Sequence, residues 1–405
     1  MTALVIDNIG LLITHDPELG DQAQVSLVME GGCVVAVEQT GAAGDVRLDA
    51  RGMCVIPGFV DSHTHLVFAG DRSAEFAARM AGAPYRAGGI RETVRATRQA
   101  TLDELRELAA ARRHEALRAG ITTLEVKSGY ALDVPGERRL CQVASEFTDE
   151  VTFLGAHVVP AEYQERPDDY VSLVSGQMLQ ACAPSARWVD AFCERGAFDV
   201  DQCREVLLAG RRAGLGVRVH ANQLGPGPGV RLAVELGAAS ADHCTHLKPD
   251  DITALSGSDT VATLLPATDF STRQPYPDAR ALIDAGVTVA LATNCNPGSS
   301  YTTSMAFCIA LGVREMGMSI REAVGCATLG GARALRRDDV GHLGLGARAD
   351  AVLLAAPSPD HLVYRPGVPL VAATVLGGRV AWTDPDLAAG PANPGPSSAP
   401  PSPPR

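Results

Sequence analysis

The middle of this chain alternates short apolar runs with longer stretches rich in alanine, leucine, arginine and glutamate. This alternation is typical of β-α units, in which each strand lies parallel to the next. The sequence predicts helices over 102–119, 136–147, 201–213 and 229–236. The predicted strands are Val55–Val60, Thr122–Val126, Thr152–Ala156, Trp188–Phe192, Gly216–Val219, Ser240–Asp242, Thr260–Leu265 and Thr288–Ala292. This set of strands predicts an α/β fold, a TIM-like (β/α)8 barrel over residues 53–345.

Both ends of the chain have a different pattern. Short strand-like runs separated by Gly, Asp and Asn turns fill residues 1–52, and they recur over 346–382, where Gly377-Gly378 marks a turn. We therefore expect a small composite β-domain, built from these two segments and attached to the barrel. The final residues, 383–405, are rich in proline, serine and alanine, which predicts a disordered tail.

The acidic balance of the chain restricts its partners. It has 35 lysines and arginines against 47 aspartates and glutamates, a formal net charge of −12. Such a charge repels phosphate backbones and anionic membranes, so we expect no nucleic acid and no membrane as partner. A small anionic substrate remains compatible, because one arginine can bind it. The ten cysteines form no CxxC pair, and the N-terminus does not resemble a secretory signal, which favours a cytoplasmic protein.

Histidines stand at the ends of the predicted strands. His63 and His65 close the first strand, and because side chains alternate along a strand, the two face the same side. Such a pair is half of a metal site, since a catalytic zinc or iron site takes three or four protein ligands. His157, His220 and His243 end the third, fifth and sixth strands. Active sites of such barrels lie at the carboxyl ends of the strands, where we expect these five histidines to meet.

Each of these histidines also has a simpler interpretation. A His-x-His pair can lie on a surface without metal, and a single histidine at a strand end can be an ordinary core residue. The convergence of five favours a metal and proton-transfer cluster. The fourth strand carries no lysine that could bridge two metals as a carbamate, so a single metal ion is expected. We expect the other histidines on the surface: His15, His114, His246, His342 and His361.

Six motifs together resemble the imidazolonepropionases of the amidohydrolase superfamily. They are Gly58-Phe-Val-Asp-Ser-His-Thr-His65, Lys127-Ser-Gly-Tyr130, Phe153-Leu-Gly-Ala-His157, His220-Ala-Asn-Gln223, Ala241-Asp-His243 and Asn294-Cys-Asn-Pro-Gly-Ser299. The first alone indicates only a metal-dependent amidohydrolase. The full resemblance, from about Leu4 to Trp382, implies hydrolysis of 4-imidazolone-5-propanoate to N-formimidoyl-L-glutamate in histidine degradation. It also implies a cytoplasmic homodimer with one zinc or iron ion per chain.

The resemblance further implies roles for individual residues. The metal ligands would be His63, His65, His220 and Asn294. The substrate-binding residues would be Arg72, Tyr130, His157, Gln223, Asn296, Gly298 and Ser299, with Arg72 on the propanoate carboxylate. The catalytic positions would be His243, near the attacking water, and Asn294; on chemical grounds we also expect His157 to donate to the developing oxyanion.

Two positions depart from the family pattern. Asn294 stands where the family has a metal-binding aspartate, and Gln223 stands where a glutamate is common. An amide oxygen can bind a metal, but it is neutral and takes up no proton at neutral pH, which leaves His243 as the expected base. Three alternatives stay open: a related deaminase, another cyclic amidohydrolase, and a low-activity or inactive ligand-binding variant. Aromatic residues make up only 4% of the chain, which disfavours a purine or pyrimidine ring that would stack on them.

Overall fold

The strand and helix alternation of the middle produces a parallel sheet that curls into a barrel. In the computed structural model, which describes residues 2–82 and 89–388, this sheet has the strand order β14-β13-β12-β11-β10-β9-β8. The strands are β8 (Val126–Lys127), β9 (Val151–Ala156), β10 (Trp188–Cys193), β11 (Gly216–Ala221), β12 (Ser240–His243), β13 (Val261–Leu264) and β14 (Val289–Leu291). Each pairs with its neighbour in parallel.

Two further strands, β6 (Phe59–Asp61) and β7 (Ile121–Leu124), close the ring. They pair with each other in parallel, and β7 continues into β8 after a single residue. On the other side, the chain after β6 meets the chain after β14. The backbone N–H of Asn294 donates to the carbonyl of His63 (3.0 Å), and that of His65 donates to the carbonyl of Cys295 (2.9 Å). The result is an α/β barrel, as predicted.

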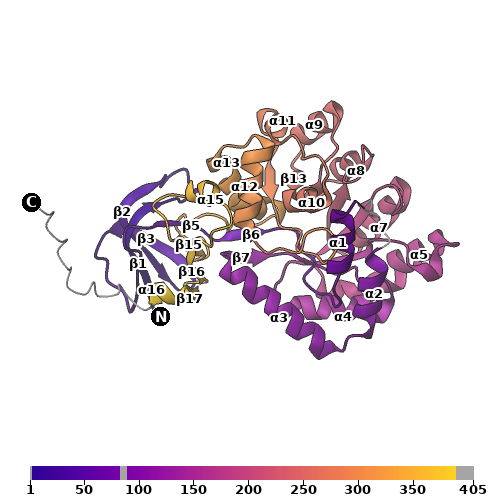
Figure 1. Cartoon of the computed structure of the whole chain (residues 1–405), viewed down its shortest axis with the longest axis horizontal. Coiled ribbons are helices and arrows are strands. Elements are labelled where there is room, and N and C mark those ends of the chain that lie inside the picture. The colour runs from indigo at the N-terminus through magenta and orange to yellow at the C-terminus, as the bar shows by residue number, and fades with distance from the viewer. Residues whose placement is uncertain (1, 83–88, 389–405) are drawn as a thin grey trace, which may run out of the picture.

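Helices surround the barrel (Figure 1). Thr101 and Asp199 are the N-caps of α3 and α7. The side chain of each accepts from the backbone N–H three residues later, and the side chain of that later residue accepts from the N–H of the cap. The predicted helices correspond to α3, α4, α7 and α8. The helices are α1 (Ser73–Met80), α2 (Ile90–Gln99), α3 (Leu102–Arg118), α4 (Val134–Ser145), α5 (Pro167–Leu173), α6 (Leu179–Cys182), α7 (Val200–Arg212), α8 (Gly229–Glu235), α9 (Pro249–Ser256), α10 (Pro266–Thr272), α11 (Ala279–Asp284), α12 (Met305–Met316), α13 (Ile320–Gly325), α14 (Gly331–Ala334), α15 (His361–Tyr364) and α16 (Pro385–Ala388). Within the described ranges, none of them has the length and apolarity needed to cross a bilayer.

The two chain ends form one sheet beside the barrel (Figure 1). Its order is β17-β16-β15-β5-β1-β2-β3, with β4 paired to β1. The strands are β1 (Leu4–Leu12), β2 (Gln22–Glu30), β3 (Cys33–Gln39), β4 (Val46–Asp49), β5 (Cys54–Pro57), β15 (Ala351–Leu354), β16 (Val371–Leu376) and β17 (Arg379–Thr383). The disordered tail predicted over residues 383–405 is wrong for its first residues, because β17 ends at Thr383 and α16 follows; residues 389–405 lie outside the described residues.

The single strand predicted over residues 55–60 is wrong. β5 lies in the end sheet between β1 and β15, whereas β6 begins the barrel at Phe59. Gly58 separates the two strands, and a side chain does not fit there, because an added Cβ would lie 2.2 Å from Oγ1 of Thr122. One apolar run therefore crosses from one sheet to the other, and the barrel starts at residue 59 rather than 53.

Candidate metal centre

The five histidines predicted at strand ends lie together at the carboxyl end of the barrel. The ring centroid of His63 is 5.3 Å from that of His65, 4.5 Å from that of His220 and 5.7 Å from that of His243. The ring of His157 stacks on that of His65 at 5.4 Å. The predicted convergence is confirmed.

Three of these histidines can hold one metal ion. Ligand nitrogens of His63, His65 and His220 all lie within 4.8 Å of one another, and the three side chains are buried. Nε2 of His63 is buried without a hydrogen-bond partner, which costs free energy unless a ligand takes up its lone pair. Imidazole nitrogens suit both zinc and iron. The residues therefore fit the metal that the sequence predicted.

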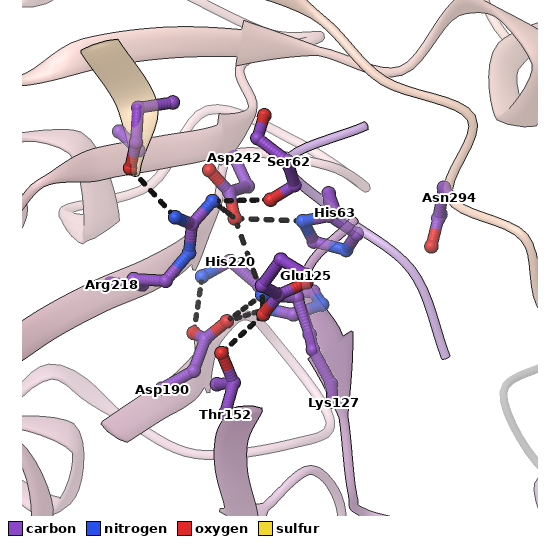
Figure 2. Close-up of polar contacts among 12 residues, drawn as sticks. Ser62, His63, Glu125, Lys127, Thr152, Asp190, Arg218, His220, Asp242 and Asn294 are labelled. Atoms are coloured by element: carbon purple, nitrogen blue, oxygen red, sulfur yellow. Dashed lines mark hydrogen bonds and ion pairs between the residues drawn. The ribbon is translucent and has the colours of Figure 1, made fainter. Parts of the chain in front are cut away.

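Two buried carboxylates lie against the histidines of the metal site (Figure 2). Asp242 Oδ2 lies 2.7 Å from Nδ1 of His63, and Asp190 Oδ2 lies 2.9 Å from Nδ1 of His220. Because an ionised carboxylate only accepts hydrogen bonds, His63 carries its proton on Nδ1 and leaves Nε2 for the metal. Burial alone would raise the pKa of Asp242, but Arg218 and His63 beside it hold that pKa well below its ordinary range.

Four of the rim histidines are neutral at neutral pH: His63, His65, His157 and His243. Burial lowers the pKa of His63, His65 and His243 well below 6.5. It also lowers the pKa of His157 to about 4, and the neighbouring His220 adds to this shift. Neutral imidazole is the form that binds a metal and accepts a proton.

The orientation of His157 contradicts one expected role. Its Nδ1 lies 2.9 Å from the carbonyl oxygen of Gly129. A carbonyl oxygen can only accept, so Nδ1 carries the proton, and Nε2 of the neutral ring is an acceptor. His157 therefore does not donate to an oxyanion in its neutral form, contrary to the prediction from sequence.

A pocket opens at the metal-binding histidines. Ile90, Val158, Phe192 and Leu224 supply its apolar wall. The predicted site residues that line it are His65, Arg72, Tyr130, His157, His220, Gln223, His243, Asn294, Asn296, Gly298 and Ser299. The sequence thus identified nearly the whole polar lining. His63, the remaining predicted residue, is completely buried.

Arg72 lies in the pocket wall and is already paired. Its Nε and Nη2 donate to the carboxylate of Glu75 at 2.9 and 2.8 Å. The guanidinium also lies against Gly298, where an added Cβ would come within 2.2 Å of Nη1. These contacts fix the position of the guanidinium, and its contact with a substrate carboxylate stays a prediction.

Asn296 builds the turn that carries Gly298 and Ser299. Its Oδ1 accepts from the backbone N–H groups of both residues (2.8 and 2.9 Å), and its Nδ2 donates to the carbonyl of Asn294 (2.6 Å). Nδ2 of Asn294 donates to Oγ1 of Thr268 (2.8 Å), and its Oδ1 is buried without a hydrogen-bond partner. That amide oxygen is available to a ligand, whereas the side chain of Asn296 is used within the turn.

Five charged residues beneath the site were not predicted from the sequence: Glu125, Lys127, Asp190, Arg218 and Asp242. All are fully buried beneath the histidines (Figure 2). The sequence did contain a signal, because charged residues stand within or beside apolar strand runs. Charged residues are rarely buried unless they are paired, so these positions indicated buried ion pairs. The sequence alone does not say which partner each one meets.

The five remaining histidines were expected on the surface, and of these only His114 is exposed. The other four are half-buried at loops or helix ends: His15, His246, His342 and His361. For His15, Nδ1 lies 2.9 Å from Oγ1 of Thr328, and burial lowers its pKa. None of the four contributes to the pocket.

Comparisons with known proteins show the family of this chain. The model of the amidohydrolase family matches residues 54–381. The imidazolonepropionase of Mycolicibacterium smegmatis is 65% identical over 389 residues, which cover 94% of this chain and 98% of that protein. The imidazolonepropionase of Streptomyces griseus is 58% identical over 387 residues, with 94% and 99% covered.

Solved structures show the same fold. An atrazine chlorohydrolase mutant from Arthrobacter aurescens, complexed with zinc and atraton, superposes with a TM-score of 0.72 at 19% identity, covering 93% of this chain and 94% of that one. A zinc-bound adenosine deaminase from Xanthomonas campestris superposes with a TM-score of 0.70 at 18% identity, covering 95% of both chains. From the extent and identity of the sequence matches, this chain belongs to the amidohydrolase family and, within it, to the imidazolonepropionases.

Proposed function

We propose that this chain hydrolyses the ring amide of 4-imidazolone-5-propanoate to N-formimidoyl-L-glutamate, a step of histidine degradation. The observation that carries the proposal is the set of three buried histidines with ligand nitrogens within 4.8 Å of one another. They adjoin a pocket lined by the family's motif residues. The relatives named imidazolonepropionase support the choice of substrate.

One ion of zinc or iron would be held by His63, His65 and His220, with the amide oxygen of Asn294 as a fourth ligand. When bound, such an ion supplies Lewis-acid activation of the substrate carbonyl and of a water molecule. Lys127 does not bridge a second ion, because it is paired with buried carboxylates.

His243 is suited to act as the base. Its Nδ1 is buried without a hydrogen-bond partner, and its ring lies 5.5 Å from that of His220. Because burial lowers its pKa well below 6.5, the ring is neutral and can take a proton from water. The backbone of His243 has φ 79°, a conformation that residues other than glycine rarely adopt and that tends to be kept at functional positions.

The other pocket residues would position the substrate. Arg72 presents a planar guanidinium for the propanoate carboxylate. Nε2 of His157, an acceptor in the neutral ring, would accept a hydrogen bond from a ring N–H of the substrate. Tyr130, whose ring lies 5.4 Å from that of His157, would pack against the same substrate ring.

Metal content and turnover together test the proposal. Protein loaded with zinc or with iron should bind one ion per chain and should convert imidazolonepropanoate to a product identified by mass spectrometry. Two tightly bound ions, or none after loading, would contradict the single-metal site. One bound ion without turnover would instead support the ligand-binding variant, for which the neutral Asn294 is the specific observation.

We further propose a cytoplasmic homodimer in which the end sheet is a satellite domain of the barrel. The dimer and the compartment rest on the family resemblance. The ten free cysteines are compatible with a reducing compartment. Light scattering on the purified protein measures the oligomeric state directly.

A further inference from the structure

Five charged side chains form a buried charge cluster beneath the metal-binding histidines: Glu125, Lys127, Asp190, Arg218 and Asp242. All are fully buried. The strands β8, β10, β11 and β12 contribute one residue each, and Glu125 is the residue between β7 and β8. The cluster contains three carboxylates and two cations. Buried ion pairs cost desolvation energy that their attraction often fails to offset, so an arrangement of this size calls for a role other than stability.

Two members of the cluster hold metal ligands through their side chains. Asp242 orients His63, as described above, and Arg218 holds Asp242 in turn, with Nη2 3.3 Å from its Oδ2. The same Nη2 donates to the carbonyl of Ser62, immediately before His63 (2.7 Å). Asp190 contacts His220 with both oxygens, since Oδ1 accepts from the backbone N–H of His220 (3.1 Å).

Glu125 holds the third ligand through the backbone. Its Oε2 accepts from the N–H of Thr64 (3.1 Å), the residue between His63 and His65. Oγ1 of Thr64 donates to the carbonyl of Glu125 (2.6 Å), and Thr152 donates to the carboxylate of Glu125. The His-x-His segment is therefore fixed from below by Glu125.

A single cation contacts all three of these carboxylates (Figure 2). Nζ of Lys127 lies 2.8 Å from Glu125, 2.9 Å from Asp190 and 3.6 Å from Asp242. We infer that Lys127 is a positioning residue that holds these three carboxylates in place. It thereby sets the affinity of the metal site without touching metal or substrate. This inference rests on the proposed metal centre.

Zinc affinity of the metal-free protein, measured by competition with a chromophoric chelator, tests the inference. Lys127→Met keeps the length of the side chain and removes its charge. We expect zinc affinity to fall roughly 10- to 100-fold, the usual effect of losing a group that orients metal ligands. Adding Asp190→Asn to this variant should lower zinc affinity much less than Asp190→Asn does in the wild-type protein, because Lys127 acts in part through that carboxylate.

A matched control separates positioning from general destabilisation. Glu150, immediately before β9 and so at the opposite end of the barrel, is also a buried carboxylate, and it accepts a hydrogen bond from Nε1 of Trp188 (2.8 Å). Glu150→Gln should lower the melting temperature and leave zinc affinity within about two-fold. Equal affinity losses in Glu150→Gln and Lys127→Met would overturn the inference, and so would a folded Lys127→Met with unchanged affinity.

If Lys127→Met does not fold, Asp190→Asn and Asp242→Asn answer the same question. Their effects on zinc affinity should be non-additive, because Lys127 contacts both carboxylates, and strictly additive effects would refute the inference. A wild-type protein that binds no zinc or iron would refute the proposed metal centre itself, and this outcome is distinct from equal binding by wild type and variants.

Discussion

Replacing Asn294 by aspartate should raise turnover by about 10²-fold or more. The structure accommodates the change, because the two side chains have the same shape and both tolerate the left-handed backbone of this residue (φ 51°). Thr268, which now accepts from Nδ2 of Asn294 at 2.8 Å, can rotate its hydroxyl and donate to a carboxylate instead. The second carboxylate oxygen would take the place of the present Oδ1, which is buried without a partner.

The magnitude follows from two opposing effects. A carboxylate can relay the second proton of the attacking water, and acid-base help of this kind is worth ~10²- to 10⁴-fold. A neutral ligand leaves the metal more electrophilic, which partly favours the present amide, but this gain should be the smaller one. In the metal-free protein the same substitution should be unfavourable, because it should lower the free energy of unfolding. Burial raises the pKa of Asp61, nearby on β6, to about 7. A buried carboxylate at 294 with a similarly raised pKa should lower the free energy of unfolding at pH 7 by about 4 kcal/mol.

Steady-state rates at equal metal occupancy decide the matter. Asn294→Ala is the control, because it removes the amide oxygen without adding a charge. Aspartate should raise the rate constant for turnover, stabilise the metal-loaded protein and destabilise the metal-free protein. Alanine should not raise the rate constant and should not stabilise the metal-loaded protein. An unchanged rate for Asn294→Asp at full occupancy would show that the proton leaves by another route, with His243 the first candidate.

Three further outcomes are expected. Arg72→Gln should weaken binding of the substrate about tenfold more than binding of an analogue without the carboxylate, and equal losses would assign Arg72 to its structural pair with Glu75. Gly298→Ala should raise KM roughly 10- to 100-fold, because its Cβ would displace the Arg72 guanidinium, and an unchanged KM would contradict that packing. Burial lowers the pKa of His157 from 6.5 to about 4. The contribution of neutral His157 to the free energy of unfolding is therefore fully present above pH 6.5 and is lost as pH falls towards 4. Chemical denaturation over that range should show a loss of at most about 3 kcal/mol, because the ring is partly open to the pocket, and His157→Gln should abolish it.

The sequence predicted the parts of the fold that depend on local pattern. Periodicity located the barrel strands and four of the helices, and the strand-end rule placed the five histidines on one rim. It failed at Gly58, because an uninterrupted apolar run does not show that its two halves belong to different sheets. The reason is tertiary, since Thr122 fills the space a side chain at residue 58 would need.

The candidate site divides in the same way. Residues that line the pocket could be named from motifs, because their chemistry is readable from residue type. The proton position of His157 could not be predicted, because it depends on a carbonyl group 28 residues away in the sequence. The roles of Lys127 and Arg218 also depend on partners brought by different strands.

The buried charge cluster bears on how this chain can hold a dication with neutral ligands. His63, His65, His220 and Asn294 contribute no negative charge, while the three carboxylates and two cations beneath them leave one net negative charge. The compensating anion thus lies one layer below the ligands, where it also orients them. Charge at position 294 and charge in the cluster should therefore have separable effects. At full metal occupancy, Asn294→Asp should raise turnover through proton transfer, whereas Lys127→Met should lower zinc affinity and leave turnover per bound ion nearly unchanged. If Lys127→Met changed turnover per bound ion as much as Asn294→Asp does, this division of roles would be refuted.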